Sequence, residues 1–101
     1  MKIYITGKVT GEPIAECTIK FGTAQKQLEA LGHQAINPLA VVNDFKATWQ
    51  DAMKLCIKAL MDADAIYLLA CSNNSKGAAV EIELAKHLQI PMFNNLKNIP
   101  K

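Results

Sequence analysis

Apolar residues recur at helical spacing over three stretches of the chain and at strand spacing over four shorter ones. Gly32 and Pro38 interrupt this pattern at points where a helix and a strand are expected to end. The predicted helices extend from about Ile14 to Leu31, from about Trp49 to Asp62 and from about Gly77 to Leu88. The predicted strands are Lys2–Thr6, Gln34–Asn37, Ala65–Ala70 and Pro91–Asn94, with a loop at Val41–Thr48 and a tail after the last strand.

Strands and helices alternate in the order βαβαβαβ, and each connection is too long for a hairpin. This order predicts an α/β protein with a three-layer parallel sheet and right-handed crossovers. We expect a flavodoxin-like strand order of 2-1-3-4, with Ala65–Ala70, which is apolar on both faces, as a central strand. Ligands of such sheets bind beyond the carboxyl ends of the strands where the order reverses, here at residues 7–11 and 71–77.

The length of 101 residues predicts a single domain over residues 1–101, because chains usually divide only beyond about 150–200 residues. Eleven basic and nine acidic residues give a net charge of +2 without a basic cluster, which disfavours binding to extended nucleic acid. The N-terminal apolar run is too short for a signal peptide, and the longest apolar stretch, Ala65–Cys71, is too short to cross a bilayer. Cys17, Cys56 and Cys71 form no CxxC pair. We therefore expect a reduced cytoplasmic protein that contacts no membrane.

Common cofactor and metal motifs are absent from the sequence. Gly7 and Gly11 form G-x-x-x-G rather than the G-x-G-x-x-G of dinucleotide-binding folds, and there is no P-loop. Zinc-type spacings of Cys and His are also absent. His33 and His87 stand alone, and we expect solvated or helix-capping roles for them. The sequence therefore indicates no metal and no organic cofactor.

Glu81 is an unusual residue on the third predicted helix. It falls near the middle of the apolar arc that includes Val80 and Leu88, whereas Glu83 falls on the polar side. A carboxylate on the core side of a helix is costly unless it has partners or lines a cavity. The alternative is a helix-start glutamate stabilised by the helix dipole. Ser75 likewise has two interpretations, as the N-cap of this helix or as a ligand contact.

Three stretches of the sequence carry a family resemblance. They are the opening strand and glycine loop Ile3–Gly11, the segment Trp49–Lys54 leading into Asp62–Leu69, and Ser75-x-Gly77-x-x-x-Glu81-x-x-x-Ala85. Together they resemble the nucleoside 2-deoxyribosyltransferase-like superfamily, and most closely its small, largely uncharacterised phage and bacterial branch. The resemblance covers nearly the whole chain in the expected order.

The resemblance implies an enzyme that acts on the N-glycosidic bond of a small nucleoside or nucleotide, by deoxyribosyl transfer or by hydrolysis. Glu81 would be the nucleophile that attacks the anomeric carbon and leaves a covalent ribosyl ester, with net retention of configuration. Tyr4 would orient this carboxylate, and Ser75 would lie beside the sugar or its 5′ substituent. Gly7 would let the ligand approach closely, and amides near Gly77 are candidates for a phosphate contact. Active relatives are homo-oligomers, so a homodimer is implied.

One residue departs from the pattern of the active relatives. They carry an aspartate eight residues before the one that opens the third strand, and counting back eight from Asp64 arrives at Cys56. A thiol cannot replace a carboxylate that holds a sugar hydroxyl or moves a proton, and such a loss typically costs about 10²–10⁴-fold in rate. Asp51 and Asp62 are expected on the polar side of their helix. Two hypotheses follow: an enzyme that uses Glu81, or a non-catalytic protein that binds a nucleotide or ribosyl ligand.

Overall fold

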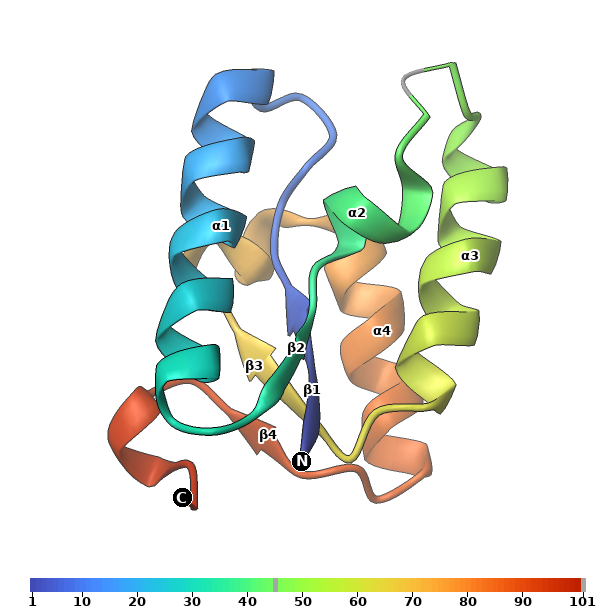
Figure 1. Ribbon diagram of the computed structural model, residues 1–101. Helices are drawn as coiled ribbons and strands as arrows, with labels where there is room; N and C mark the ends of the chain where they lie inside the picture. The colour runs from blue at the N-terminus through green and yellow to red at the C-terminus, as the bar shows by residue number, and fades with distance from the viewer. Residues whose placement is uncertain (45, 101) are drawn as a thin grey trace.

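The strands form one parallel sheet in the order that the sequence predicts. The computed structural model describes residues 1–44 and 46–100, with Asn73 as backbone alone, and its strands are ordered β2-β1-β3-β4. Each pairing is parallel. Figure 1 shows helices on both sides of this sheet. The elements are β1 (Lys2–Thr6), α1 (Ile14–Ala30), β2 (Gln34–Ile36), α2 (Pro38–Val42), α3 (Trp49–Met61), β3 (Ala65–Leu68), the 3₁₀ helix η1 (Ala70–Asn74), α4 (Lys76–His87), β4 (Met92–Phe93) and the 3₁₀ helix η2 (Leu96–Asn98).

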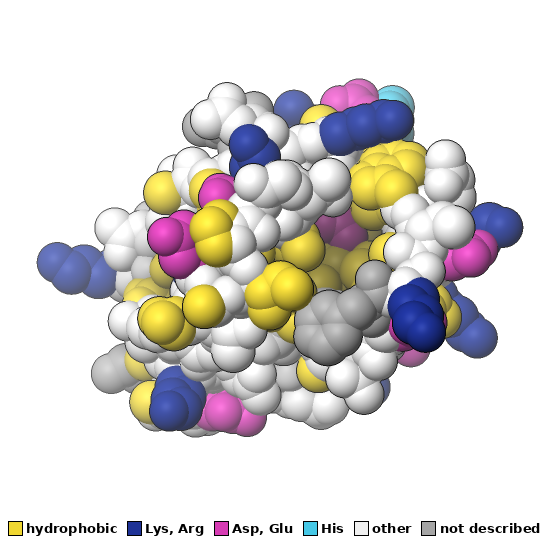
Figure 2. Space-filling view, turned by 90° about the horizontal axis from the view of Figure 1, so that it is seen from above, with side chains coloured by type: hydrophobic (Ala, Val, Ile, Leu, Met, Phe, Trp, Pro, Cys, Tyr) yellow, Lys and Arg dark blue, Asp and Glu magenta, His cyan; other side chains and the backbone are white. Residues whose placement is uncertain are grey.

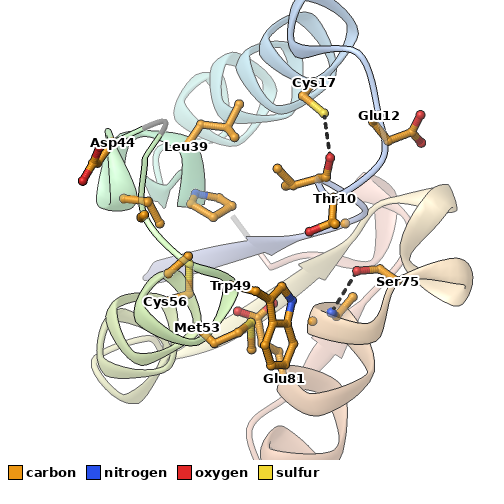
Figure 3. A pocket seen from close by; sticks show the side chains of 18 of the residues that line it. Thr10, Glu12, Cys17, Leu39, Asp44, Trp49, Met53, Cys56, Ser75 and Glu81 are labelled. Carbon is orange, nitrogen blue, oxygen red and sulfur yellow. Dashed lines mark hydrogen bonds between the residues drawn. The ribbon is translucent and has the colours of Figure 1, made fainter.

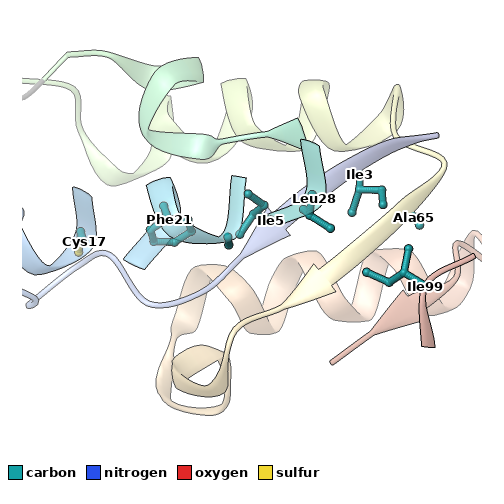
Figure 4. Close-up of a cluster of buried hydrophobic side chains, with 8 residues drawn as sticks. Ile3, Ile5, Cys17, Phe21, Leu28, Ala65 and Ile99 are labelled. Atoms are coloured by element: carbon teal, nitrogen blue, oxygen red, sulfur yellow. The ribbon is translucent and has the colours of Figure 1, made fainter. Parts of the chain in front are cut away.

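Side chains of β1 alternate between the two faces of the sheet, as the pleat of a strand requires. Ile3 and Ile5 are fully buried in a cluster with Phe21 and Leu28 of α1 (Figure 4). Tyr4 belongs to a second cluster, together with buried residues of α3 and α4. The two clusters give the three-layer α/β architecture that the sequence predicts, with α1 on one face and α3 and α4 on the other.

A short helix, α2, replaces the start of the predicted loop at Val41–Thr48. The side chain of Asn37 accepts a hydrogen bond from the Leu39 amide at 3.0 Å, and Pro38 occupies the first helical turn. The loop prediction was therefore wrong for its first two residues, because an Asn-Pro pair both ends a strand and starts a helix. Phe45, in the same predicted loop, lies outside the described residues.

The C-terminal residues are packed against the rest of the chain, so the predicted tail was wrong. Ile99 is 4% exposed and belongs to the cluster between α1 and the sheet. His33, predicted to be solvated or capping, is also buried: its Nδ1 lies 3.2 Å from the amino nitrogen of Met1, and its Nε2 lies 2.6 Å from the carbonyl oxygen of Pro100. Both corrections arise from contacts between distant segments, which local periodicity does not report. Lys101 lies outside the described residues.

The other element boundaries lie within a few residues of the predicted ones. The largest difference is at the end of β3, which stops at Leu68 because residues 70–74 form η1. β4 is also shorter than predicted, at two residues. Within the described ranges, none of the helices combines the length and the apolar character needed to cross a membrane.

Candidate functional site

A cavity of about 580 Å³ opens beyond the carboxyl ends of β1 and β3, at the edge of the sheet where the strand order predicts a ligand. This volume lies within the range of roughly 300–1,000 Å³ that is typical of small-molecule sites. Figure 2 shows a hollow lined by hydrophobic side chains, with an acidic group in its depth. The lining comes from β1 and the loop after it (Tyr4, Gly7, Val9, Thr10, Glu12), α1 (Ile14, Cys17, Thr18), the α2 region (Pro38, Leu39, Val42, Asn43, Asp44), the start and inner face of α3 (Ala47, Thr48, Trp49, Ala52, Met53, Cys56) and the start of α4 (Ser75, Gly77, Ala78, Glu81).

Glu81 of α4 lines this cavity and is 5% exposed (Figure 3). The hydroxyl of Tyr4 donates a hydrogen bond to Oε2 of Glu81 at 2.5 Å. The hydroxyl of Thr6 donates to Oε1 at 2.8 Å. Both donors come from the same face of β1, so one strand fixes both oxygens of the carboxylate. A buried, oriented carboxylate that borders a cavity is chemically suited to act as a nucleophile or a general base.

The surroundings of Glu81 shift the ionisation of three groups. Burial raises the pKa of the Glu81 carboxyl above its ordinary value, and the hydrogen bonds from Tyr4 and Thr6 act in the opposite direction. Burial, reinforced by the charge of Glu81, raises the pKa of Tyr4, so its phenol stays protonated and donates. Burial also raises the pKa of the Cys56 thiol. The carboxyl group of Glu81 is therefore held by two neutral hydrogen-bond donors, the hydroxyls of Tyr4 and Thr6.

The buried face of α4 differs from the apolar arc that the sequence predicts. Ala78, Glu81 and Ala85 are buried, whereas Val80 and Leu88 are 40% and 45% exposed. The prediction was wrong for Val80 and Leu88 because a helical wheel gives relative directions without the position of the sheet. Glu81 nevertheless lies on the buried side, and a stabilising helix dipole does not by itself account for that burial.

The two glycines predicted at the site are packed closely against neighbouring side chains. A Cβ added at Gly7 would lie 2.9 Å from Cδ1 of Leu69 and 3.2 Å from Cζ of Phe21. Gly7 is predicted to let a ligand approach closely, but packing alone already requires glycine at this position. A Cβ added at Gly77 would lie 3.1 Å from Sδ of Met53, so the start of α4 is held close to α3.

The start of α4 carries Ser75 and borders a second, smaller cavity. The hydroxyl of Ser75 accepts a hydrogen bond from the Ala78 amide at 3.1 Å, which makes it the helix N-cap, and Ser75 also lines both cavities. The ammonium group of Lys76 lies 4.3 Å from the centroid of the Trp49 ring, in cation–π contact. Lys8 and Lys76 line the second cavity, whose volume is about 390 Å³. Both interpretations of Ser75 are therefore compatible with its position.

Cys56, the position at which the family resemblance implies an aspartate, lines the cavity and is 7% exposed. Asp51 and Asp62 are exposed, as predicted, and neither lines the cavity. Two other acids, Glu12 and Asp44, do line it, although they lie on loops that the sequence analysis did not single out. No periodic pattern marks a loop acid, so only the fold brings these carboxylates to the cavity.

Thr6 and Trp49 are the other candidate residues that the sequence analysis did not assign. Thr6 is fully buried and bonds to Glu81, and Trp49 lines both cavities. The available signal for Thr6 was its position two residues after Tyr4, which places both hydroxyls on one face of the strand. A single tryptophan at a helix start carries no comparable signal.

Histidine and cysteine do not assemble into a metal site in the described segments. No group of three or more His, Cys, Asp or Glu residues there is arranged to hold a metal ion. His87 is exposed, and its Nε2 lies 3.3 Å from Oε1 of Glu83, one helical turn away. The predicted solvated role of His87 agrees with this position. Cys17, Cys56 and Cys71 are free thiols.

Comparisons with known proteins agree with this fold. No curated protein matches the chain. A solved structure of a 2-deoxyribosyltransferase from the psychrotolerant bacterium Bacillus psychrosaccharolyticus is similar, with a TM-score of 0.68 and 19% sequence identity over 91% of this chain and 69% of that one. The fold is thus that of the superfamily that the sequence resembles. Residues 1–94 match the model of the family described as a domain of unknown function (DUF4406). The chain therefore belongs to the DUF4406 family, with the fold of a 2-deoxyribosyltransferase.

Proposed function

We propose that this chain is an enzyme that cleaves the N-glycosidic bond of a nucleoside or nucleotide, with Glu81 as the nucleophile, and passes the deoxyribosyl group to another base or to water. The observation that carries the proposal is the Glu81 carboxylate, which is buried from bulk solvent, hydrogen-bonded at both oxygens and part of the lining of a cavity of small-molecule size. The shared fold with a 2-deoxyribosyltransferase supports the same class of reaction.

The reaction would proceed in two displacements. An oxygen of Glu81 forms a bond to the anomeric carbon, and the bond from that carbon to the base nitrogen breaks, with its electron pair leaving on the base. The departing base takes up a proton, and the sugar remains as an ester of Glu81. A second base, or water, then attacks the same carbon and gives up a proton, while the bond from that carbon to Glu81 breaks and returns its electron pair to the carboxylate. Two inversions give net retention of configuration, as in retaining glycoside hydrolysis.

The cavity lining suggests how the substrate would lie. Pro38, Leu39 and Val42 form an apolar wall that suits a flat, weakly polar base. Tyr4 lines the larger cavity beside Glu81, where the sugar would lie, and Ser75 lines both cavities, where the 5′ substituent would lie. The basic side chains at that second cavity leave both a nucleoside and its 5′-monophosphate as candidate substrates.

Cys56 favours a second candidate function, in which the protein binds the same ligand without chemistry. The thiol faces the cavity where active relatives carry an aspartate, and its raised pKa keeps it neutral. A neutral thiol accepts a hydrogen bond from a sugar hydroxyl far more weakly than a carboxylate, and it is a much weaker acid than a carboxyl group. Glu12 and Asp44 line the same cavity and are the acids available to protonate the leaving base in the enzyme hypothesis.

The test is release of free base from a panel of ribonucleosides, 2′-deoxynucleosides and their 5′-monophosphates, followed by chromatography. We expect release by the wild-type protein and a loss of at least about 10²–10⁴-fold in Glu81→Gln. Glu83→Gln is the matched control, because Glu83 lies on the same helix and is exposed to solvent. Release that survives in Glu81→Gln would contradict the assignment of Glu81.

Absence of release from every compound would favour the binding hypothesis. Trp49 is the one tryptophan of the chain and lines both cavities, so its fluorescence reports binding without chemistry. A saturable change with a nucleoside, in the absence of base release, would support the binding protein. Cys56→Asp would then test whether restoring the carboxylate restores cleavage.

A further inference from the structure

Thr6 occupies a buried strand position at which valine, which has the same shape and no polar group, would be expected. It is fully buried in a central strand, where β-branched apolar residues are favoured. A hydroxyl at such a position costs free energy unless it is hydrogen-bonded. Its partner is Oε1 of Glu81, at 2.8 Å, on an element far away in the sequence. The hydrogen bond to Glu81 at the candidate site, and not packing within the strand, therefore offsets the cost of burying the Thr6 hydroxyl.

The two oxygens of Glu81 have different surroundings. Oε2 accepts from Tyr4 and Oε1 accepts from Thr6; both donors are fully buried, but only Tyr4 lines the cavity. The cavity lining therefore includes the donor to Oε2 but not the donor to Oε1. A carboxylate held at one oxygen alone can rotate about its last bond, and the second bond removes that freedom.

We propose that Thr6 is a positioning residue, which holds Oε1 of Glu81 against the sheet so that Oε2 faces the cavity and attacks the anomeric carbon. This inference rests on the proposed function, since it assigns roles to the two oxygens of the same nucleophile. In the attack, Oε2 forms the new bond to carbon as the base departs with the electron pair of the broken bond. Oε1 then becomes the carbonyl oxygen of the ester and keeps its hydrogen bond from Thr6. The bond from Tyr4 to Oε2 weakens, because that oxygen loses its charge.

Thr6 also affects the charge state of Glu81. Its hydrogen bond lowers the pKa of Glu81 and so opposes the effect of burial. Removing the hydroxyl should raise that pKa and move the acid limb of the pH–rate profile to higher pH. Packing alone would not produce such a shift, so the pKa distinguishes a positioning role from a structural one.

The experiment compares Thr6→Val, which keeps the shape and removes the hydroxyl, with Thr6→Ser, which keeps the hydroxyl. Thr23→Val is the matched control, because Thr23 is exposed on α1 and lies outside both cavities. The ¹³C resonance of the Glu81 carboxyl, assigned with Glu81→Gln, is titrated in each protein, and kcat and KM for base release are measured. If Thr6→Val does not fold, Thr6→Cys, whose thiol is a weaker donor, takes its place.

We expect Thr6→Val to raise the pKa of Glu81 and to lower kcat by roughly 10–100-fold with little change in KM, as for loss of a hydrogen bond to a charged group. Thr6→Ser should restore both quantities, and Thr23→Val should change neither. An unchanged pKa in a folded Thr6→Val protein would overturn the inference, as would an equal loss in Thr6→Ser. If the pKa of Glu81 shifts in Thr6→Val but the wild-type protein releases no base, the hydrogen bond from Thr6 does hold Glu81, and the proposed function is wrong.

Discussion

The two faces of β1 are built from alternate residues of one five-residue strand, yet they have opposite character. Ile3 and Ile5 enter an apolar cluster under α1. Tyr4 and Thr6 direct their hydroxyls to the carboxylate of Glu81 under α4. All four side chains are fully buried, so burial does not distinguish the faces. The difference lies in what each face does: one excludes water, and the other orients a charge.

This comparison shows how a small protein can hold a buried carboxylate without a positive partner. Two neutral donors on one strand satisfy both oxygens, and no buried side-chain nitrogen or oxygen in the described part of the chain lacks a partner. The apolar face opposite keeps the strand in place. Under the proposed function, alternate positions of β1 serve stability and chemistry, and substitutions on the two faces should separate the two effects.

Ile5→Ala should give the largest effect on stability and little effect on chemistry. Deletion of a fully buried isoleucine side chain typically costs about 2–5 kcal/mol in free energy of unfolding. Urea unfolding measures this loss, and base release per folded molecule should stay within about twofold of wild type. A large fall in kcat without loss of stability would show that the two faces are not independent.

Tyr4→Phe should give the reverse result. The phenyl ring keeps the packing, while one hydrogen bond to the Glu81 carboxylate is lost. We expect kcat to fall by roughly 10–100-fold, the range for a hydrogen bond to a charged group. Urea unfolding should show a far smaller change than for Ile5→Ala. An unchanged kcat in Tyr4→Phe would show that the hydrogen bond from Tyr4 to Glu81 plays no part in the reaction.

The two site glycines should respond differently to alanine. Gly7→Ala brings a methyl group within 2.9 Å of Leu69. This overpacking should lower the free energy of unfolding by about 1–3 kcal/mol. Gly77→Ala meets the flexible end of Met53 at 3.1 Å, and the higher helix propensity of alanine, worth up to about 1 kcal/mol, offsets that contact. Thermal unfolding of both variants tests the contrast. Equal losses at both positions would contradict this account of their packing.

Glu81→Gln should stabilise the folded state, by an amount that grows with pH. Folding raises the pKa of Glu81, which means that the folded state favours the protonated carboxyl. The resulting stabilisation is fully present below the unfolded-state pKa and is lost as the pH rises through the folded-state pKa. We expect similar Tm values near pH 4 and a Tm higher by a few degrees in the variant near pH 8, where about 1 kcal/mol corresponds to about 4–8 °C. A lower Tm in the variant at pH 8 would mean that the carboxylate is better accommodated than its burial indicates.

Much of the fold could be predicted because it depends on local periodicity. The alternation of β1, the helix ending at Gly32 and the apolar strand at β3 all have direct sequence signals. α2 was missed because Val41 and Val42 are poor helix formers that follow a strand-ending Asn-Pro pair. The burial of Ile99 was missed because it depends on contacts with distant residues.

The candidate site was predictable only in part, for a related reason. Periodicity placed Glu81 toward the core, although it misplaced Val80 and Leu88 by leaving out the direction of the sheet. Thr6 has meaning only once α4 is docked beside β1, since its partner is Glu81. Residues whose role depends on a neighbour from another element cannot be identified from their own segment.

The most direct test of the account is the configuration of the sugar product when methanol competes with water as acceptor. ¹H NMR of the first-formed methyl deoxyriboside, from a β-nucleoside that the wild-type protein cleaves, distinguishes the two anomers. Attack by Glu81 followed by attack of methanol predicts the β-anomer alone, and predicts no methyl deoxyriboside from Glu81→Gln. The α-anomer, or a mixture of the two, would contradict a covalent intermediate on Glu81.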